Sequence, residues 1–178
     1  QTDSNEGLEA VRHRIRRDWL DDMHTFKTIS KRGNLVGEVS KIVDEQHIGL
    51  VVLGNSGRSE IEAIFMGSNA LDVISSVKEC PILTVPKEVD FKVPKEIAFV
   101  TDYTHSYDAG LLEPLLFMTR RYGSKIRVMH INEEEVLDSR QIINKSILLE
   151  YLLPFENSFH WMPLFKSKAT AINIFLEE

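Results

Sequence analysis

Three glycines and a serine have the spacing of a phosphate-binding loop. Gly54 and Gly57 follow a short apolar run that ends at Leu53. Gly67 and Ser68 open a segment whose apolar residues recur at helical spacing. Glycine lets a backbone approach a ligand closely, and the first turn of a helix offers N–H groups and the positive end of a dipole to a phosphate. The alternative is that Gly57 closes a turn and Ser68 only caps the helix, but a strand, a loop and a helix in this order favour phosphate binding.

The other reactive side chains lack the spacing of a catalytic or metal site. Cys80 precedes Pro81 and has no neighbouring base in the sequence, so we expect a small buried residue and not a nucleophile. His130 ends an apolar run, which is more typical of a hydrogen-bonded core or rim histidine than of a ligand. The sequence holds no His/Cys cluster with zinc spacing and no lysine directly after the glycines. We therefore expect a protein that is not an enzyme.

Composition restricts the partners. The chain has 178 residues, 43% of them apolar, and a net charge of −6, which argues against a nucleic-acid partner because phosphate contacts need clustered Lys and Arg. No apolar run approaches the roughly 18 residues of a membrane span, so no membrane partner is expected. The single cysteine excludes an internal disulfide and fits a reducing compartment, and the polar, acidic N-terminus is unlike a signal peptide. These features predict a cytoplasmic protein.

Hydrophobic periodicity divides the chain into alternating helices and strands. This alternation predicts the α/β class with a parallel, doubly wound sheet. Pro114 predicts a kink or a late start in the helix that Gly123 ends. The apolar positions of 36–45 recur in 169–178 at a constant offset of 133 residues (172 minus 39), which indicates two copies of one unit. We expect helices at 8–23, 34–45, 68–77, 106–122, 139–153 and 167–178, strands at 25–30, 50–53, 82–85, 96–101, 125–131 and 159–165, and a linker at 86–95.

The pattern Gly-x-x-Gly-x9-Gly-Ser at residues 54–68 resembles the nucleotide signature of the universal stress protein family. Its flanks agree, since an apolar strand precedes it and Cys80 and Pro81 lead into another. Asn55 and Ser56 stand where many members have Thr and His, which affects the side-chain contacts of the loop and not its backbone contacts. Residues 94–102 resemble the opening strand of the family, and 128–131 resemble its second strand. The chain therefore resembles a tandem member of the family that is incomplete at both ends.

The resemblance implies a Rossmann-like, adenine nucleotide alpha hydrolase-like sheet with strand order 3-2-1-4-5. By this plan, residues 1–90 are the C-terminal part of a first repeat and residues 91–178 are the N-terminal part of a second. Neither part alone holds a complete sheet, but their strands sum to one. We expect the two half-domains to complement each other, within one chain or between two swapped chains. The alternative is that the sequence is a piece of a longer tandem protein.

The resemblance also implies a bound adenine nucleotide, ATP or AMP, optionally with Mg²⁺. Asp102 matches the aspartate that lies at the adenine end of the nucleotide, and its alternative role is to cap the loop before Ser106. Family members usually pair through strand 5, so a homodimer through 82–85 is expected. The implied nucleotide-binding residues are Leu53, Gly54, Asn55, Ser56, Gly57, Gly67, Ser68, Asn69, Thr101 and Asp102.

Three classes of function stay open. The glycine signature favours a nucleotide-binding stress-response or signalling module without efficient catalysis. The residues Asn55 and Ser56 favour an interaction module that dimerises and binds no nucleotide. A hydrolase or pyrophosphatase of the related type would need a loop such as Ser-Gly-Gly-x-Asp-Ser, which the sequence lacks, so this class ranks last.

Overall fold

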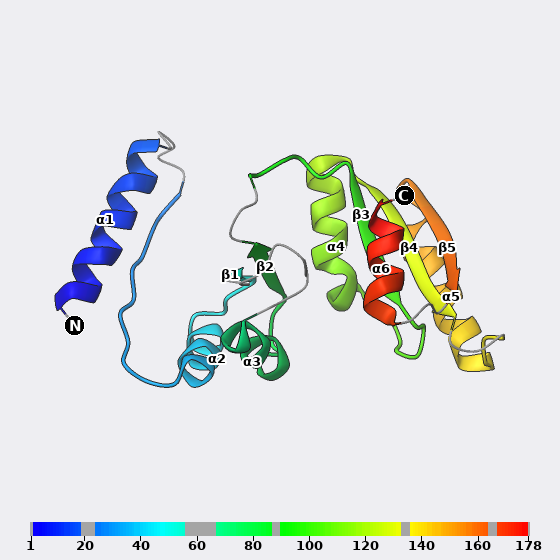
Figure 1. Ribbon diagram of the computed structural model, residues 1–178, viewed down its shortest axis with the longest axis horizontal. Coiled ribbons are helices and arrows are strands. Elements are labelled where there is room, and N and C mark those ends of the chain that lie inside the picture. Colours follow the sequence, from blue (N-terminus) through cyan, green and yellow to red (C-terminus); the bar gives the residue numbers. More distant parts are fainter. Residues whose placement is uncertain are drawn as a thin grey trace. The chain divides into compact units, whose positions relative to one another are not determined.

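A computed structural model describes residues 2–18, 24–55, 67–86, 90–132, 136–163 and 167–177 (Figure 1). The chain divides into two compact units, 1–87 and 88–178, which we call unit 1 and unit 2. Each unit has its own parallel sheet, with strand order β1-β2 in unit 1 and β3-β4-β5 in unit 2. The α/β class with parallel sheets is thereby confirmed. A single order 3-2-1-4-5 and the complementation of the two half-domains stay predictions.

The described residues of unit 1 form α1 (Thr2–Asp18), α2 (Leu35–Glu45), β1 (Val51–Asn55), α3 (Ser68–Ser76) and β2 (Ile82–Pro86). As predicted, Asn34 caps α2, with its side-chain oxygen accepting the backbone N–H of Gly37 at 3.2 Å. Helices α2 and α3 cover one face of the sheet, where Val43, Val73 and Val77 form the core. The half-buried Cys80 packs against this core, in line with the expectation of a structural residue.

Within the described residues, nothing covers the opposite face of this small sheet. Side chains alternate between the two faces of a strand, so Val51, Leu53 and Ile82 point to the core while their neighbours point away from it. Val52, Leu83 and Val85 remain 56%, 43% and 36% exposed. Parallel sheets usually have both faces covered, so unit 1 presents an apolar strand surface without a covering helix among its described residues.

The strand expected at 25–30 is wrong. This segment runs as extended chain and pairs with no strand among the described residues. Phe26 and Ile29, which suggested an inward face, are each 38% exposed. A strand is stabilised by its ladder and by the burial of one face, and this segment has neither.

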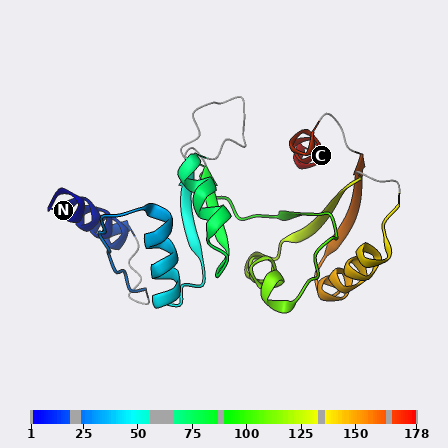
Figure 2. The ribbon, with the colours of Figure 1, turned by 90° about the horizontal axis from the view of Figure 1, so that it is seen from below.

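Unit 2 alternates strands and helices throughout. Its elements are β3 (Glu96–Thr101), α4 (Ala109–Tyr122), β4 (Lys125–Asn132), α5 (Ser139–Leu152), β5 (Asn157–Pro163) and α6 (Lys168–Glu177). Figure 2 shows α4 and α5 on one face of the sheet and α6 on the other. The strand at 96–101 has its predicted bounds, and the other strands and helices of this unit lie within a few residues of theirs.

Two signals in the sequence set the bounds of α4. The helix starts late, at Ala109, where the side chain of Asp108 accepts the N–H of Leu111 at 2.8 Å. Pro114 lies inside the helix, and Gly123 ends it in the left-handed conformation with φ of 66°. The predicted glycine end is confirmed, because it follows from a local backbone restriction. The helix starts three residues later than the expected 106, but Pro114 still lies beyond its first turn, so the start is set by the Asp108 cap.

The core of unit 2 has two parts, one on each face of the sheet. On the α4/α5 face, the fully buried Leu112, Leu148 and Leu152 pack against Ile126 and Val128 of β4. The face under α6 is covered by a second cluster, made of Met129, Ile131, Met162, Ala171 and Phe175. The carboxyl ends of β3 and β4 are thus held from both sides. Among the described residues, no helix has both the length and the apolar character that crossing a membrane requires.

Candidate functional site

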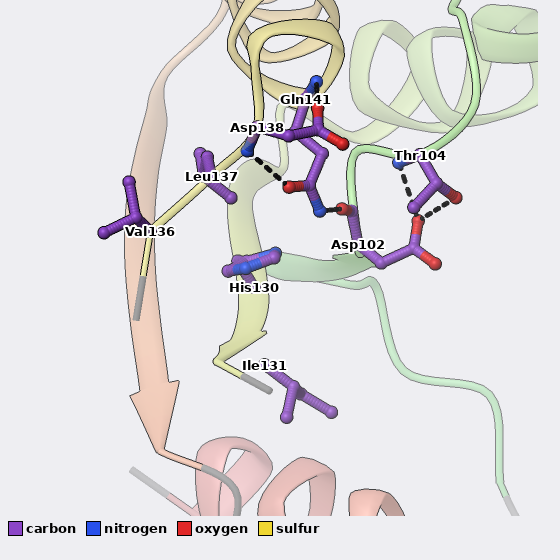
Figure 3. Close-up of a pocket in the computed structure, with 8 residues that line it drawn as sticks. All are labelled: Asp102, Thr104, His130, Ile131, Val136, Leu137, Asp138 and Gln141. Atoms are coloured by element: carbon purple, nitrogen blue, oxygen red, sulfur yellow. Dashed lines mark hydrogen bonds between the residues drawn. The ribbon is translucent and has the colours of Figure 1, made fainter. Parts of the chain in front are cut away.

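The carboxyl ends of β3 and β4 carry the polar residues of unit 2 that could bind a ligand. Ligands of open α/β sheets bind outside this end of the strands. A cavity of about 230 Å³ lies there (Figure 3). The residues that line it are Asp102, Thr104, His130, Ile131, Val136, Leu137, Asp138 and Gln141.

Asp102 organises the loop that follows β3. Its Oδ1 accepts the backbone N–H of Thr104 at 2.9 Å and the hydroxyl of the same residue at 2.8 Å. The backbone bond is the main reason that the pKa of Asp102 lies below its ordinary value of 3.8. The carboxylate is therefore ionised near neutral pH, and within the part of the chain that the structure describes Oδ2 takes no hydrogen bond. The predicted capping of this loop is confirmed, and one carboxylate oxygen is left over to bind a ligand.

The turn after Asp102 is held by side chains that come from far along the chain. Tyr103 is 2% exposed and has a φ of 59°, a left-handed conformation that costs a side-chain-bearing residue roughly 1 kcal/mol. The side-chain amide of Asn144 donates to the backbone carbonyl of Tyr103 at 2.7 Å. The side-chain amide of Gln141 donates to the backbone carbonyl of Asp102 at 2.9 Å. These contacts fix the loop against α5. The sequence analysis did not identify Tyr103, Gln141 or Asn144.

One signal in the sequence could have identified Gln141. An acidic residue followed three positions later by Gln is the signature of a capping box. Asp138 and Gln141 form one at the start of α5, with the Asp138 side chain accepting the N–H of Gln141 at 2.7 Å and the Gln141 side chain accepting that of Asp138 at 2.9 Å. The cap therefore also positions the amide that holds the carbonyl of Asp102.

His130 is a hydrogen-bonded core histidine, as predicted. It is 5% exposed, and its Nδ1 lies 3.1 Å from the carbonyl oxygen of Thr101 on the neighbouring strand. Its ring stacks on Tyr103 with ring centres 4.9 Å apart and meets Trp161 at 4.6 Å. The imidazole therefore has a fixed position in the wall of the cavity.

A second cavity, of about 330 Å³, is also lined by Asp102. Thr101 and Asp102 share it with His105 and with Lys168 at the start of α6. Two of the predicted site residues thus lie together at an edge with acidic and basic groups nearby. Among the described residues, no group of three His, Cys, Asp or Glu side chains is arranged to hold a metal ion.

The remaining predicted residues belong to unit 1. Leu53 faces the core, Gly54 lies near the end of β1 opposite Val85, and Asn55 is the last residue of that strand. Gly67 is the N-cap of α3, and the exposed Ser68 and Asn69 form its first turn. The alternative in which Ser68 only caps the helix is therefore wrong, because Gly67 takes the cap position. Ser56 and Gly57 lie outside the described residues.

The end of β1 and the start of α3 lie at the same end of unit 1 (Figure 2). A side-chain carbon added at Gly54 would meet nothing within 4 Å, so the backbone there borders open space. This arrangement can present strand-end and helix-start N–H groups to an anion.

Residues 3–86 match the model of the Universal stress protein family. No curated protein and no solved structure matches the chain.

Proposed function

We propose that this chain, in which residues 3–86 match the universal stress protein family, is a stress-response module. In this proposal it binds an adenine nucleotide, ATP or AMP, and retains it without efficient turnover. The observation that carries the proposal is the position of the glycine signature, at the end of a parallel strand and the start of a helix, inside the matched region. Mg²⁺ is an optional companion of the phosphates.

The start of α3 and the end of β1 support the phosphate part of the proposal. A helix N-terminus favours anions through its N–H groups and its dipole, and α3 has Ser68 as an exposed hydroxyl in its first turn. The first turn of α3 contains no acidic side chain, so none of its own residues would take the place of a phosphate there. The open space beside Gly54 leaves room for a phosphate to approach the backbone.

Within unit 2 alone, Asp102 is a candidate contact for an adenine base. Its carboxylate lies at a strand end beside two cavities and keeps one oxygen for a ligand. The family resemblance assigns the matching aspartate to the adenine end, and Thr101 precedes it at the end of β3.

Replacing Gly54 with valine tests the phosphate part. Valine is accepted in a strand, and the added carbon meets no neighbour, so the fold should be unchanged. The side chain would occupy the space that a phosphate needs, and we expect ATP affinity to fall at least tenfold in isothermal titration. Gly49→Val is the matched control, because Gly49 also has open space around it but precedes the amino end of β1. Equal ATP affinity in both variants would contradict a phosphate site at Gly54.

We also propose that residues 91–178 are the N-terminal part of a second repeat, which would make the chain a tandem member of the family. Support comes from element bounds: α6 begins 133 residues after α2 (168 minus 35), the offset found in the sequence. The order β5-β4-β3 in unit 2 agrees with strands 3, 2 and 1 of the expected plan.

The open face of unit 1 favours a second function, an interaction module that forms a homodimer through β2 in the cytoplasm. Strand β2 pairs only with β1 among the described strands, so one of its edges is unpaired, and Leu83 and Val85 lie exposed beside it. An unpaired parallel edge with apolar side chains is a template for pairing with another chain.

A charge at Leu83 tests this pairing. Leu83→Glu would place a carboxylate in the proposed interface. In analytical ultracentrifugation we expect the unaltered chain to sediment as a dimer and the variant as a monomer, with an association constant at least tenfold lower. The control is Leu71→Glu on α3, where the leucine is similarly exposed at 45% but lies away from the strand edge. If Leu83→Glu leaves the sedimentation coefficient unchanged, β2 is not the interface.

A further inference from the structure

Helix α5 presents an apolar line of side chains on the side that faces away from the sheet. Its buried residues Leu148 and Leu152 pack against the sheet, and Figure 2 shows no other described element of unit 2 on the far side of the helix. Residues at intervals of four, three and four positions lie in one line along a helix. On this far side the line consists of Ile142, Ser146, Leu149 and Leu153, which we call the α5 stripe.

The α5 stripe is exposed and makes little demand for water. Ile142, Leu149 and Leu153 are 53%, 44% and 70% exposed. Ser146, the polar member, donates its hydroxyl to the backbone carbonyl of Ile142 at 3.0 Å, so its proton already has an acceptor. Leu153 keeps helical dihedral angles, with φ of −48° and ψ of −39°, and continues the line. Contiguous exposed apolar side chains of this kind mark an interaction site.

The spacing of the α5 stripe is self-complementary. The intervals of four, three and four read the same in both directions, about a midpoint between residues 147 and 148. In an antiparallel pair of α5 helices, Ile142 of one copy therefore lies opposite Leu153 of the other, and Ser146 lies opposite Leu149. The small serine leaves room for the larger leucine, as a knob fits a hole between packed helices. A contact that matches itself under a two-fold rotation is the isologous contact of a homodimer.

The charges of α5 also fit an antiparallel copy. The half before the midpoint carries Arg140 and Lys145, and the half after it carries Glu150. The helix dipole favours the reverse order, and α5 has neither an acidic residue in its first turn nor a basic one in its last. An antiparallel copy places opposite charges beside each half, whereas a parallel copy would place like charges there. The charge order thus favours one orientation of the partner helix.

We propose that the α5 stripe is a self-association surface, on which α5 of a second copy of this chain packs in the antiparallel orientation. The inference rests on unit 2 alone and is independent of nucleotide binding and of β2. One helix stripe is a small surface beside the roughly 1,200 Å² that stable specific complexes bury. The contact is therefore reversible and forms at high protein concentration, while in a dilute chain the stripe stays exposed.

Sedimentation equilibrium of the full chain carrying Leu83→Glu, from about 10 μM to about 1 mM, tests this contact. Leu83→Glu removes pairing through β2, and it is silent if β2 pairs with nothing. We expect a monomer at the low end of this range and a dimer at the high end. Adding Ile142→Glu should lower the association constant at least tenfold, because a carboxylate would be buried without a partner. Leu111→Glu is the matched control, since Leu111 is similarly exposed and lies near the start of another helix, α4.

The variant Glu150→Gln tests the orientation. In an antiparallel pair it removes an attraction to the basic half of the other copy, and the association constant should fall by about threefold. In a parallel pair Glu150 would lie beside its own copy, so its neutralisation would relieve a repulsion and raise the association constant. The sign of the change therefore separates the two arrangements.

Circular dichroism and thermal melting identify a variant that fails to fold, and the concentration series without a change in α5 needs none of these variants. A chain that stays monomeric up to about 1 mM would overturn the proposal. Equal association constants in the Ile142→Glu and Leu111→Glu chains, or a higher one in the Glu150→Gln chain, would do the same.

Discussion

Replacing Leu148 with alanine is expected to lower the free energy of unfolding of unit 2 by about 3 kcal/mol. Leu148 lies on α5, is fully buried, and belongs to the cluster that joins α4 and α5 to the sheet. Alanine removes its buried methyl groups and leaves a cavity that the surrounding leucines fill only in part. Urea denaturation followed by circular dichroism measures the change.

The neighbouring residue provides the control. Leu149 lies in the same helix turn but is 44% exposed, so Leu149→Ala should change the free energy of unfolding by less than about 1 kcal/mol. If both variants lose the same stability, the packing of α5 on the sheet is not as described.

The stability of unit 2 is expected to fall as the pH rises from about 10 to 12. Burial of the Tyr103 phenol raises its pKa from 10.0 to about 12 in the folded chain. The unfolded chain releases this proton first, so between these values the folded state binds more protons and the free energy of unfolding decreases with pH. A difference of 2 in pKa corresponds to about 2.7 kcal/mol at full effect, and urea denaturation at a series of pH values measures it.

Tyr103→Phe is the control for this titration. It keeps the ring that stacks on His130 and removes the titrating hydroxyl, so the decrease above pH 10 should become smaller. It should not vanish, because burial also raises the pKa of Tyr107 and contributes in the same direction. A profile that Tyr103→Phe leaves unaltered would contradict the buried position of the phenol.

Elements set by local restrictions could be predicted from the sequence. Asn34 before α2, Gly123 after α4 and the apolar run of β3 each determine their element through neighbours in the chain. The segment 25–30 has the composition of a strand, but a strand also needs a partner, and pairing is a tertiary property.

The candidate site was predictable only in part. Asp102 and Thr101 follow from the resemblance at the end of β3, and the single hydrogen bond of His130 agrees with the expected core histidine. The contacts of Asn144 and Gln141 with the Asp102 turn join residues 41 and 39 positions apart, and no local pattern indicates such a distance. The contact of His130 Nδ1 with the Thr101 carbonyl likewise depends on the strand pairing that sets these residues side by side.

Equilibrium dialysis of the full chain against labelled ATP tests the central claim most directly, with released phosphate measured in the same samples. We predict about one nucleotide bound per chain and no phosphate release over multiple turnovers. No retained nucleotide at millimolar ATP would contradict nucleotide binding and leave the interaction module as the function. Repeated phosphate release would contradict a protein that holds its nucleotide without turning it over.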